Sequence, residues 1–173
     1  GKTTLLKCLM GLLPAASGTI GFEGHDLTRA SSHERVRAGI GYVPQGREIF
    51  PLLTVRENLS VAWNELRGHV VQGESDLARG LVKRLGVVTP SVDQEVRRLS
   101  GGNQQKVVIG RWLAIDARVY IFDEPTKGVD VGAKHAIYEL MRSLAAQGVA
   151  VLMVSSELPE VIGMSDRILV MSD

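Results

Sequence analysis

The spacing of apolar residues near the start of the chain indicates a helix followed by two short strands. Apolar side chains recur at helical spacing and predict a short buried helix: Leu5, Leu6, Leu9 and Met10. Pro14 prevents this helix from continuing. Residues 20–22 then predict a short strand that is broken at residues 24–26, and residues 40–43 predict a second one.

The middle of the chain changes to a helical pattern. The sequence Thr-Val-Arg-Glu at residues 54–57 matches a capping box, in which a threonine hydroxyl and a glutamate side chain satisfy each other's unpaired backbone amides. Further on, Leu77, Leu81 and Leu85 lie on one apolar stripe. We therefore expect residues from about 54 to 112 to be mainly helical.

The last third of the chain predicts a parallel sheet. The apolar runs 119–122 and 149–154 have the length and composition of strands that are buried on both faces. Between them, an inward-facing helical stripe ends at Gly148: Ile137, Leu140, Met141 and Leu144. A strand, a helix and a strand in this order form one unit of a parallel sheet. A helix from about Glu157 and a strand at residues 167–171 follow, so the predicted fold class is α/β.

Length and composition exclude several kinds of protein. The 173 residues, 45% of them hydrophobic, suffice for one buried core and are too few for two domains of ordinary size. Lysine and arginine number 20 against 19 acidic residues, and a net charge of +1 gives no long-range attraction to nucleic acid or to an anionic membrane. The single cysteine, Cys8, cannot form a disulfide within the chain. No apolar run approaches the roughly 20 residues that cross a bilayer.

The first four residues, Gly-Lys-Thr-Thr, have the composition of the tail of a phosphate-binding loop. Glycine lets the backbone close around an anion, Lys2 reaches the outer phosphates, and the hydroxyl of Thr3 can ligate Mg²⁺. The positive end of the helix that follows points at the same place. Taken alone, this string equally fits a solvated chain end, and the residues downstream decide between the two readings.

Two carboxylates follow the predicted strand at residues 119–122. Asp123 and Glu124 lie at its carboxyl end, where the ligands of parallel sheets bind. One acid can hold a metal ion while the other orients a water molecule for attack on a phosphate. The alternative is an acidic pair that ends a strand in solvent. The Pro-Thr dipeptide at 125–126 and the helix-opening Asp130 favour the first reading.

The string Leu-Ser-Gly-Gly-Asn-Gln-Gln at residues 99–105 is the most specific in the chain. A serine and two glycines at a helix start leave free backbone amides that can receive a phosphate. A plain helix cap explains Ser100 but not two successive glycines followed by three side-chain amides. This string lies after Gly-Lys-Thr-Thr and before the Asp-Glu-Pro-Thr of residues 123–126, and it resembles the signature of ABC-type ATPases. The resemblance covers nearly the whole chain.

The resemblance implies a P-loop NTPase fold, with a RecA-like parallel sheet core and an inserted ABC-type helical subdomain. It implies one partial ABC ATPase domain over residues 1–173, with its core at about 1–53 and 113–173 and the helical subdomain at about 54–112. Because the chain begins at the last glycine of the phosphate loop, we expect the domain to be truncated at its N-terminus. Without the upstream strand that feeds this loop, the chain is expected to bind Mg-ATP poorly.

The resemblance also implies a substrate, ATP, a cofactor, Mg²⁺, and roles for individual residues. Glu124 is expected to activate water, with Lys2 and Gln45 as the other catalytic residues. Thr3, Gln45 and Asp123 are expected to hold Mg²⁺. The residues expected to bind the nucleotide are Gly1, Lys2, Thr3, Thr4, Ser100, Gly101, Gly102, Asp130 and Ser156.

The partners are also implied by the resemblance. In a head-to-tail dimer with a second ATPase domain, residues 100–102 would grip the γ-phosphate of ATP bound to the opposite subunit, and Asp130 would touch the partner. Gln45 belongs to a loop that contacts membrane permease subunits. The domain would lie peripherally on the cytoplasmic face of the cell membrane, and a periplasmic solute-binding protein would be an indirect partner. Nucleic acid is not an expected partner.

One departure from the family pattern concerns catalysis. These ATPases usually carry a histidine after the last core strand, and here Ser156 takes that place. A serine can donate one hydrogen bond but cannot share charge, so weak hydrolysis is expected. The histidines lie elsewhere and are interpreted as surface residues: His25, His33, His69 and His135.

Two parts of the chain resemble different importers. From about residue 89 onward, including the Ser-Ser-Glu at 155–157, the chain resembles the second ATPase half of simple-sugar importers such as those for ribose or galactose. The first sixty residues, including the strings at 41–50 and 54–58, look more like ATPases of branched-chain amino acid or urea importers. We therefore predict an importer ATPase for a monosaccharide, with amino acid or urea import as the alternative. A soluble ABC ATPase outside transport and an ATP-binding subunit with little turnover remain open.

Overall fold

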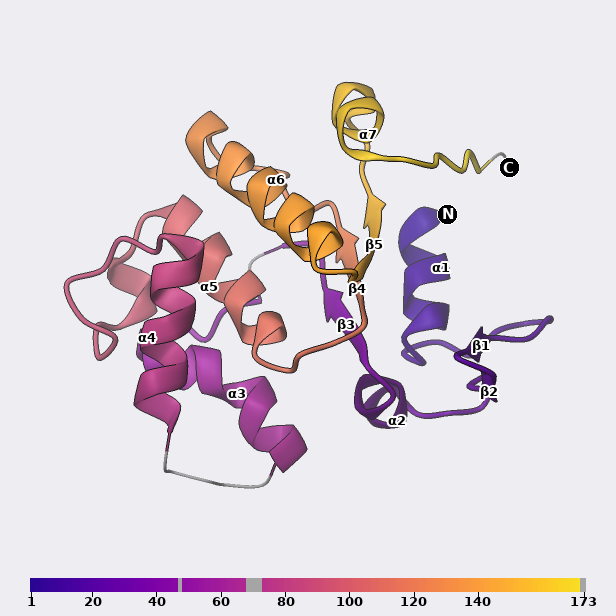
Figure 1. Cartoon of the computed structure of the whole chain (residues 1–173), viewed down its shortest axis with the longest axis horizontal. Helices are drawn as coiled ribbons and strands as arrows, with labels where there is room; N and C mark the ends of the chain where they lie inside the picture. Colours follow the sequence, from indigo (N-terminus) through magenta and orange to yellow (C-terminus); the bar gives the residue numbers. More distant parts are fainter. Residues whose placement is uncertain (47, 68–72, 172–173) are drawn as a thin grey trace.

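The computed structural model describes residues 1–46, 48–67 and 73–171 and is built around a small parallel sheet (Figure 1). Its strands are β3 (Ile40–Val43), β4 (Val119–Asp123) and β5 (Ala150–Val154), in the order β3-β4-β5. Both pairings are parallel, with Tyr42 opposite Ile121 and Phe122 opposite Met153. Helix α6 (Val131–Ala146) connects β4 to β5. The predicted α/β class is confirmed.

The two faces of the sheet are covered by different helices. Tyr120 and Phe122 on β4 belong to a large core with side chains of α5 (Gly101–Leu113) and α6. The intervening residue, Ile121, belongs to a second core with α1 (Lys2–Leu9). Alternate residues of a strand point to opposite faces, so residues 119–122 of β4 are apolar because both faces of the strand are covered.

The helices between residues 55 and 113 pack on one another and, through α5, against β3. They are α3 (Val55–Arg67), α4 (Glu74–Leu85) and α5, preceded by a single 3₁₀ turn, η1 (Val96–Arg98). This agrees with the predicted helical character of the middle of the chain. The division into a core and a helical subdomain at residues 54 and 112 stays a prediction.

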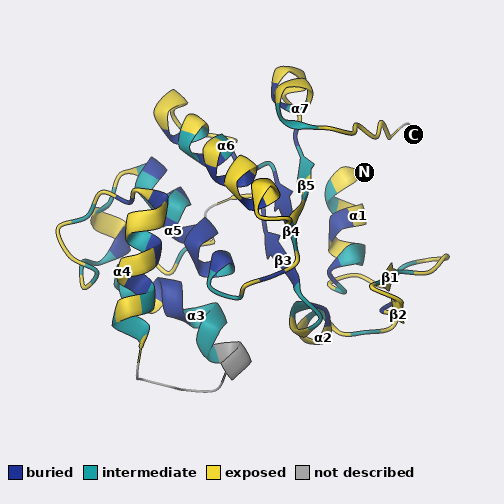
Figure 2. Ribbon diagram, in the orientation of Figure 1, coloured by how far each residue is buried: buried dark blue, intermediate teal, exposed yellow. Residues whose placement is uncertain are grey.

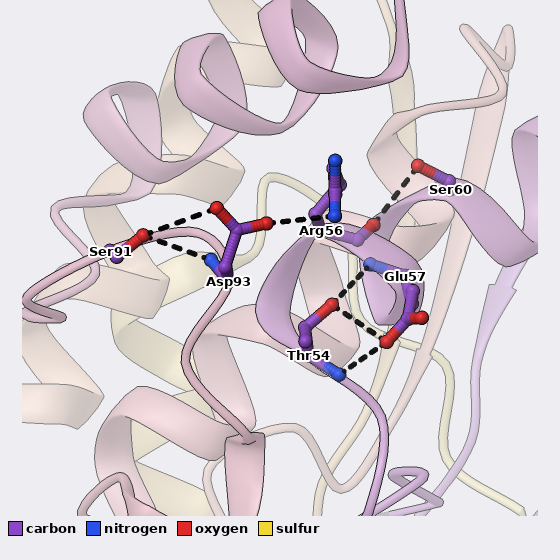
Figure 3. A network of polar contacts seen from close by, with 6 residues as sticks. All are labelled: Thr54, Arg56, Glu57, Ser60, Ser91 and Asp93. Atoms are coloured by element: carbon purple, nitrogen blue, oxygen red, sulfur yellow. Dashed lines mark hydrogen bonds and ion pairs between the residues drawn. The ribbon is translucent and has the colours of Figure 1, made fainter. Parts of the chain in front are cut away.

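A polar network fixes the start of α3 (Figure 3). The predicted capping box is present: the Thr54 backbone amide donates to Glu57 Oε2 at 2.7 Å, and the Glu57 amide donates to Thr54 Oγ1 at 3.2 Å. The Thr54 hydroxyl also donates to Glu57 Oε2 at 2.7 Å, and the two bonds that this carboxylate accepts from Thr54 hold the pKa of Glu57 below its usual value. Next to them, Arg56 pairs with Asp93 at 2.8 Å and ties α3 to the loop before η1.

The chain between α1 and β3 holds two features that the sequence pattern did not reveal. Residues 24–26 do not break a strand: β1 (Gly21–Phe22) pairs antiparallel with β2 (His25–Asp26). Glu23 and Gly24 both have positive φ, 50° and 81°, as the type I′ turn of a two-residue hairpin requires. The helix α2 (Ser32–Arg37) follows and begins with a second capping box, between Ser31 and Glu34.

The end of the chain differs from the prediction. The helix α7 (Leu158–Met164) is present, with a proline in its first turn, but residues 167–171 form no strand. Within the described chain they make no backbone hydrogen bonds, and Leu169 and Val170 are 75% and 89% exposed. The apolar run was read as a strand, yet a strand forms only where a neighbouring strand can pair with it.

The strand β5 was expected to be buried on both faces, and this is wrong. Its residues alternate between exposed and half-buried, whereas the last four residues of β4 are buried (Figure 2). Among the described strands only β4 pairs with β5, which places β5 at an edge of the sheet. Separately, no helix of the described residues combines the length and apolar character that would carry it across a membrane.

Gly41→Ala tests the packing between β3 and β4. A Cβ on Gly41 would lie 2.4 and 2.6 Å from two ring carbons of Tyr120. This ring cannot easily move, because it is buried and its hydroxyl accepts a hydrogen bond from the Ala117 amide at 3.0 Å. We expect the substitution to lower the free energy of unfolding by about 1–3 kcal/mol, measured by urea denaturation.

Gly80→Ala is the control for this measurement. Gly80 lies inside α4, and an added Cβ would meet no heavy atom within 4 Å. Alanine should therefore stabilise the helix by roughly 0.5–1 kcal/mol. A Gly41→Ala protein as stable as its parent would show that the sheet accommodates the methyl group.

Candidate functional site

The start of α1 meets the carboxyl ends of β4 and β5. The carbonyl of Gly1, the N-cap, accepts hydrogen bonds from the amides of Thr4 at 3.1 Å and Leu5 at 3.3 Å. The Thr3 hydroxyl donates to Asp123 Oδ1 at 3.4 Å, and Lys2 Nζ donates to the carbonyl oxygen of Ser155 at 3.0 Å. Three segments that are far apart in the sequence therefore converge at one edge of the sheet.

Asp123 is a fully buried carboxylate that is held on both oxygens. Thr3 donates to one oxygen, and the Tyr42 hydroxyl donates to the other at 3.3 Å. Burial and the negative charge of Asp123 raise the pKa of Tyr42 to about 12. Tyr42 therefore stays protonated at neutral pH and keeps its hydrogen for the carboxylate.

Glu124 follows Asp123 with an unusual backbone. Its φ of 50° lies in the left-handed region, while its amide still donates to the carbonyl of Val154 at 2.8 Å and extends the pairing with β5. The Ser156 hydroxyl donates to Glu124 Oε2 at 3.0 Å. Outside turns, a residue other than glycine holds this left-handed geometry only at a conformational cost, and such strain clusters at functional sites. Here the geometry places the carboxylate beyond the strand, facing the end of β5.

The segment at residues 99–105 contains the N-terminus of α5. Ser100 is its N-cap, and its hydroxyl accepts from the Asn103 amide at 3.4 Å. Gly102 is buried against the next helix, because an added Cβ would lie 3.0 Å from Asp130 Oδ2 and 2.9 Å from Ala133 Cβ. Asp130 is the N-cap of α6 and accepts from the Ala133 amide at 2.9 Å. The structure thus brings two helix N-termini together.

The sequence analysis did not identify Gln105, which makes a buried contact next to the site. Its side-chain amide donates to the carbonyl of Pro125 at 3.2 Å, and the residue is 4% exposed. This bond joins α5 to the loop that follows Glu124. The signal was its spacing, since a glutamine that lies three residues after Gly102 and four before Ile109 falls on the buried face of the helix.

A cleft of about 610 Å³ connects the edge of the sheet to the helices. It is lined by Thr3 and Asp123 at one end, by exposed Gln45 after β3, and by residues of α2, α3 and α5. The three residues predicted to hold Mg²⁺ therefore lie along one cleft. They offer a carboxylate, a hydroxyl and an amide, and oxygen donors of this kind suit Mg²⁺, which usually keeps several waters and phosphate oxygens. Among the described residues, no group of three or more His, Cys, Asp or Glu side chains is arranged so that it could hold a metal ion.

Apart from Gly1, the N-cap of α1, and Thr4 in its first turn, the predicted site residues fall into two groups. The first, here called the lysine cluster, contains Lys2, Thr3, Asp123, Glu124 and Ser156, with Gln45 along the cleft. The second, here called the Ser100 cluster, contains Ser100, Gly101, Gly102 and Asp130. Within the described chain no hydrogen bond joins the two clusters, and α1 and α5 lie on opposite sides of the sheet (Figure 1).

The histidines take no part in either cluster. His25, His33 and His135 are exposed, as expected for surface residues. His69 lies outside the described residues.

Several curated proteins with similar sequences are sugar import ATP-binding proteins. A ribose import ATP-binding protein of Rubrobacter xylanophilus is 52% identical over 99% of this chain and 36% of that protein. An arabinose import ATP-binding protein of Pseudomonas syringae pv. syringae is 46% identical over 100% of this chain and 36% of that protein. A xylose import ATP-binding protein of Photobacterium profundum is 44% identical with the same coverage. The chain thus spans about a third of the length of these relatives.

Solved structures of ATP-binding cassettes have the same fold. The dimeric post-hydrolysis state of the cassette MJ0796, bound to ADP and Pi, superposes with a TM-score of 0.80 at 25% identity, covering 92% of this chain and 71% of that one. A nucleotide-free cassette of an ABC transporter gives the same TM-score at 28% identity, covering 96% and 70%. The predicted P-loop NTPase fold is confirmed. The family model described as ABC transporter matches residues 1–127, and the chain belongs to this family.

Proposed function

We propose that this chain is the ATP-binding and hydrolysing part of an ABC-type importer that drives uptake of a monosaccharide through a separate membrane permease. The observation that carries the proposal is the convergence of Lys2, Asp123 and Glu124 at one edge of a parallel sheet. Phosphoryl transfer needs mainly positioned groups and neutralised charge, and this edge offers a cation, a buried carboxylate and a second carboxylate beside them.

The lysine cluster would supply the groups for hydrolysis. Lys2 reaches the outer phosphates of ATP, and the amides at the start of α1 face the same region. Thr3, Gln45 and Asp123 would hold Mg²⁺, which neutralises phosphate charge when it is bound. Glu124 would orient and polarise the attacking water. Ser156, which already donates to Glu124 Oε2, would keep that carboxylate in place.

The Ser100 cluster would act on a second nucleotide. Ser100, Gly101 and Gly102 lie at a helix N-terminus whose amides and dipole favour an anion. Because this cluster shares no hydrogen bond with the lysine cluster within the described chain, its role fits a head-to-tail dimer. There it would grip the γ-phosphate bound to a second ATPase domain, and Asp130 would contact that partner.

A monosaccharide is the solute favoured by the relatives, whose names specify ribose, arabinose and xylose import. The permease partners, an indirect periplasmic solute-binding protein and a place on the cytoplasmic face of the membrane follow from the same proposal. Import of branched-chain amino acids or urea is the alternative suggested by the first sixty residues. Low turnover is a second candidate, favoured by a serine at position 156 where a histidine is usual.

The solute is tested with the full-length protein and its permease in vesicles. ATP hydrolysis should rise when a pentose or galactose is supplied with the binding protein, and should not respond to leucine or urea. Stimulation by leucine or urea alone would replace the sugar proposal. A high ATPase rate without any permease would favour an ATPase outside transport.

Lys2→Ala should abolish ATP hydrolysis in the full-length protein. The lysine ammonium binds the outer phosphates and offsets charge that develops in the transition state, so we expect a loss of at least about a hundredfold in kcat. Lys83→Ala is the matched control, because Lys83 is an exposed lysine in the last turn of α4, does not line the cleft and should leave the rate unchanged. Turnover of Lys2→Ala within a few-fold of the parent would refute the assignment.

Glu124→Gln should keep ATP binding and slow the chemical step. The amide is nearly isosteric but cannot polarise water as a carboxylate does, so an ATP-bound dimer should persist. Size-exclusion chromatography with ATP measures this dimer, and a phosphate-release assay measures turnover. Normal hydrolysis together with no added dimer would show that another group activates the water.

A further inference from the structure

A buried carboxyl group behind the lysine cluster has no role in the account above. Glu160 lies on α7 and is only 5% exposed. Its Oε1 accepts a hydrogen bond from the Thr126 hydroxyl at 2.7 Å, and its Oε2 accepts one from the Ser155 hydroxyl. Glu160 therefore bridges two segments, the loop after Glu124 and the end of β5.

Ser155 is the residue through which this bridge reaches the lysine cluster. Its hydroxyl, besides donating to Glu160, accepts from the Glu157 amide at 3.0 Å. Its carbonyl accepts from Lys2 Nζ, and the next residue, Ser156, donates to Glu124. A shift of the backbone at Ser155 would therefore move both the acceptor of Lys2 and the donor to Glu124.

The surroundings of Glu160 make the burial of its carboxyl group unfavourable for stability. No ion pair reaches it within the described residues, and the nearby Lys134 pairs with Glu157 at 2.6 Å. The pKa of the Tyr138 phenol on α6 is raised mainly by burial and, to a smaller extent, by the charge of Glu160. A buried carboxylate held by hydroxyl groups stabilises a fold less than an apolar side chain of the same size would. The presence of Glu160 is therefore better explained by the groups that it holds in position than by a contribution to the stability of the fold.

We propose that Glu160 is a positioning residue of the hydrolytic site. Through Ser155 it fixes the backbone from which Ser156 faces Glu124 and at which Lys2 is held. Through Thr126 it locks that backbone to the loop that follows Glu124. The inference rests on the proposed ATPase function for its effect on turnover, while the positional part stands on the contacts alone.

Glu160→Gln removes one of the two acceptor oxygens at nearly constant volume. One of the two hydroxyl donors then faces an amide NH₂ group, and the bridge loosens at that end. In the full-length protein with its permease we expect kcat to fall about ten- to a hundredfold, as small misplacements of catalytic groups do, with KM for ATP changed less than kcat. Glu157→Gln is the matched control, because among the described residues the side chain of this exposed neighbour accepts only from Lys134, and the variant should leave kcat unchanged.

A double-variant cycle separates positioning from loss of stability. If Glu160 acts through the 155–156 segment, Ser156→Ala removes the same downstream contact. Because Glu160 also acts on Lys2 and on the loop at Thr126, the combined variant should lose less kcat than the product of the two single losses. Losses that multiply, or an equal fall in kcat for Glu157→Gln, would overturn the proposal.

Hydrogen exchange tests the positional part without turnover. The Glu157 amide is protected by the Ser155 hydroxyl, and the Glu124 amide by β5. Glu160→Gln should speed exchange at these amides and leave exchange in α5 unchanged. Thr126→Val removes the hydroxyl that donates to Glu160 and should have the same effect. Unchanged exchange in both variants overturns the proposal. If the variants exchange faster but the parent protein has no ATPase activity, the positioning role stands and only the proposed function is overturned.

Discussion

The arrangement of this chain depends on the parallel pairing of β4 with both of its neighbours. Because all three strands run in the same direction, their carboxyl ends lie at one edge, and the polar residues that follow each strand meet there. Tyr42 from β3, Asp123 from β4 and Ser155 after β5 take their positions from this register. The helix α1 then needs only to direct its first turn to the same edge.

The sequence predicted the elements whose pattern is long or clear. The strand at 119–122, the helix around Ile137 and the capping box at Thr54 carry their own local signals, and the structure contains all of them. The predictions from sequence failed where pairing between strands decides whether a segment forms a strand. Residues 167–171 are apolar enough for a strand, but no described segment pairs with them. The glycine at residue 24 was read as a break, although it forms the turn of a hairpin.

The candidate site shows the same division between composition and contact. Motif strings identified Lys2, Asp123, Glu124 and the serine at residue 100, because these residue types at these places suit phosphate chemistry. The contacts among them could not be predicted from the strings. The bonds from Tyr42 to Asp123 and from Gln105 to Pro125 cross between elements, and only the register of the sheet and the packing of α5 bring them about.

The backbone at Glu124 sets stability and chemistry against each other. Its left-handed φ of 50° is one that glycine adopts without strain and that a residue with a Cβ holds only under the constraint of its surroundings. Replacing Glu124 by glycine would therefore relieve the strain in this turn but would remove the carboxylate. Random substitution followed by selection for heat resistance would drift toward glycine here and lose the acid, whereas selection for activity would retain the strain.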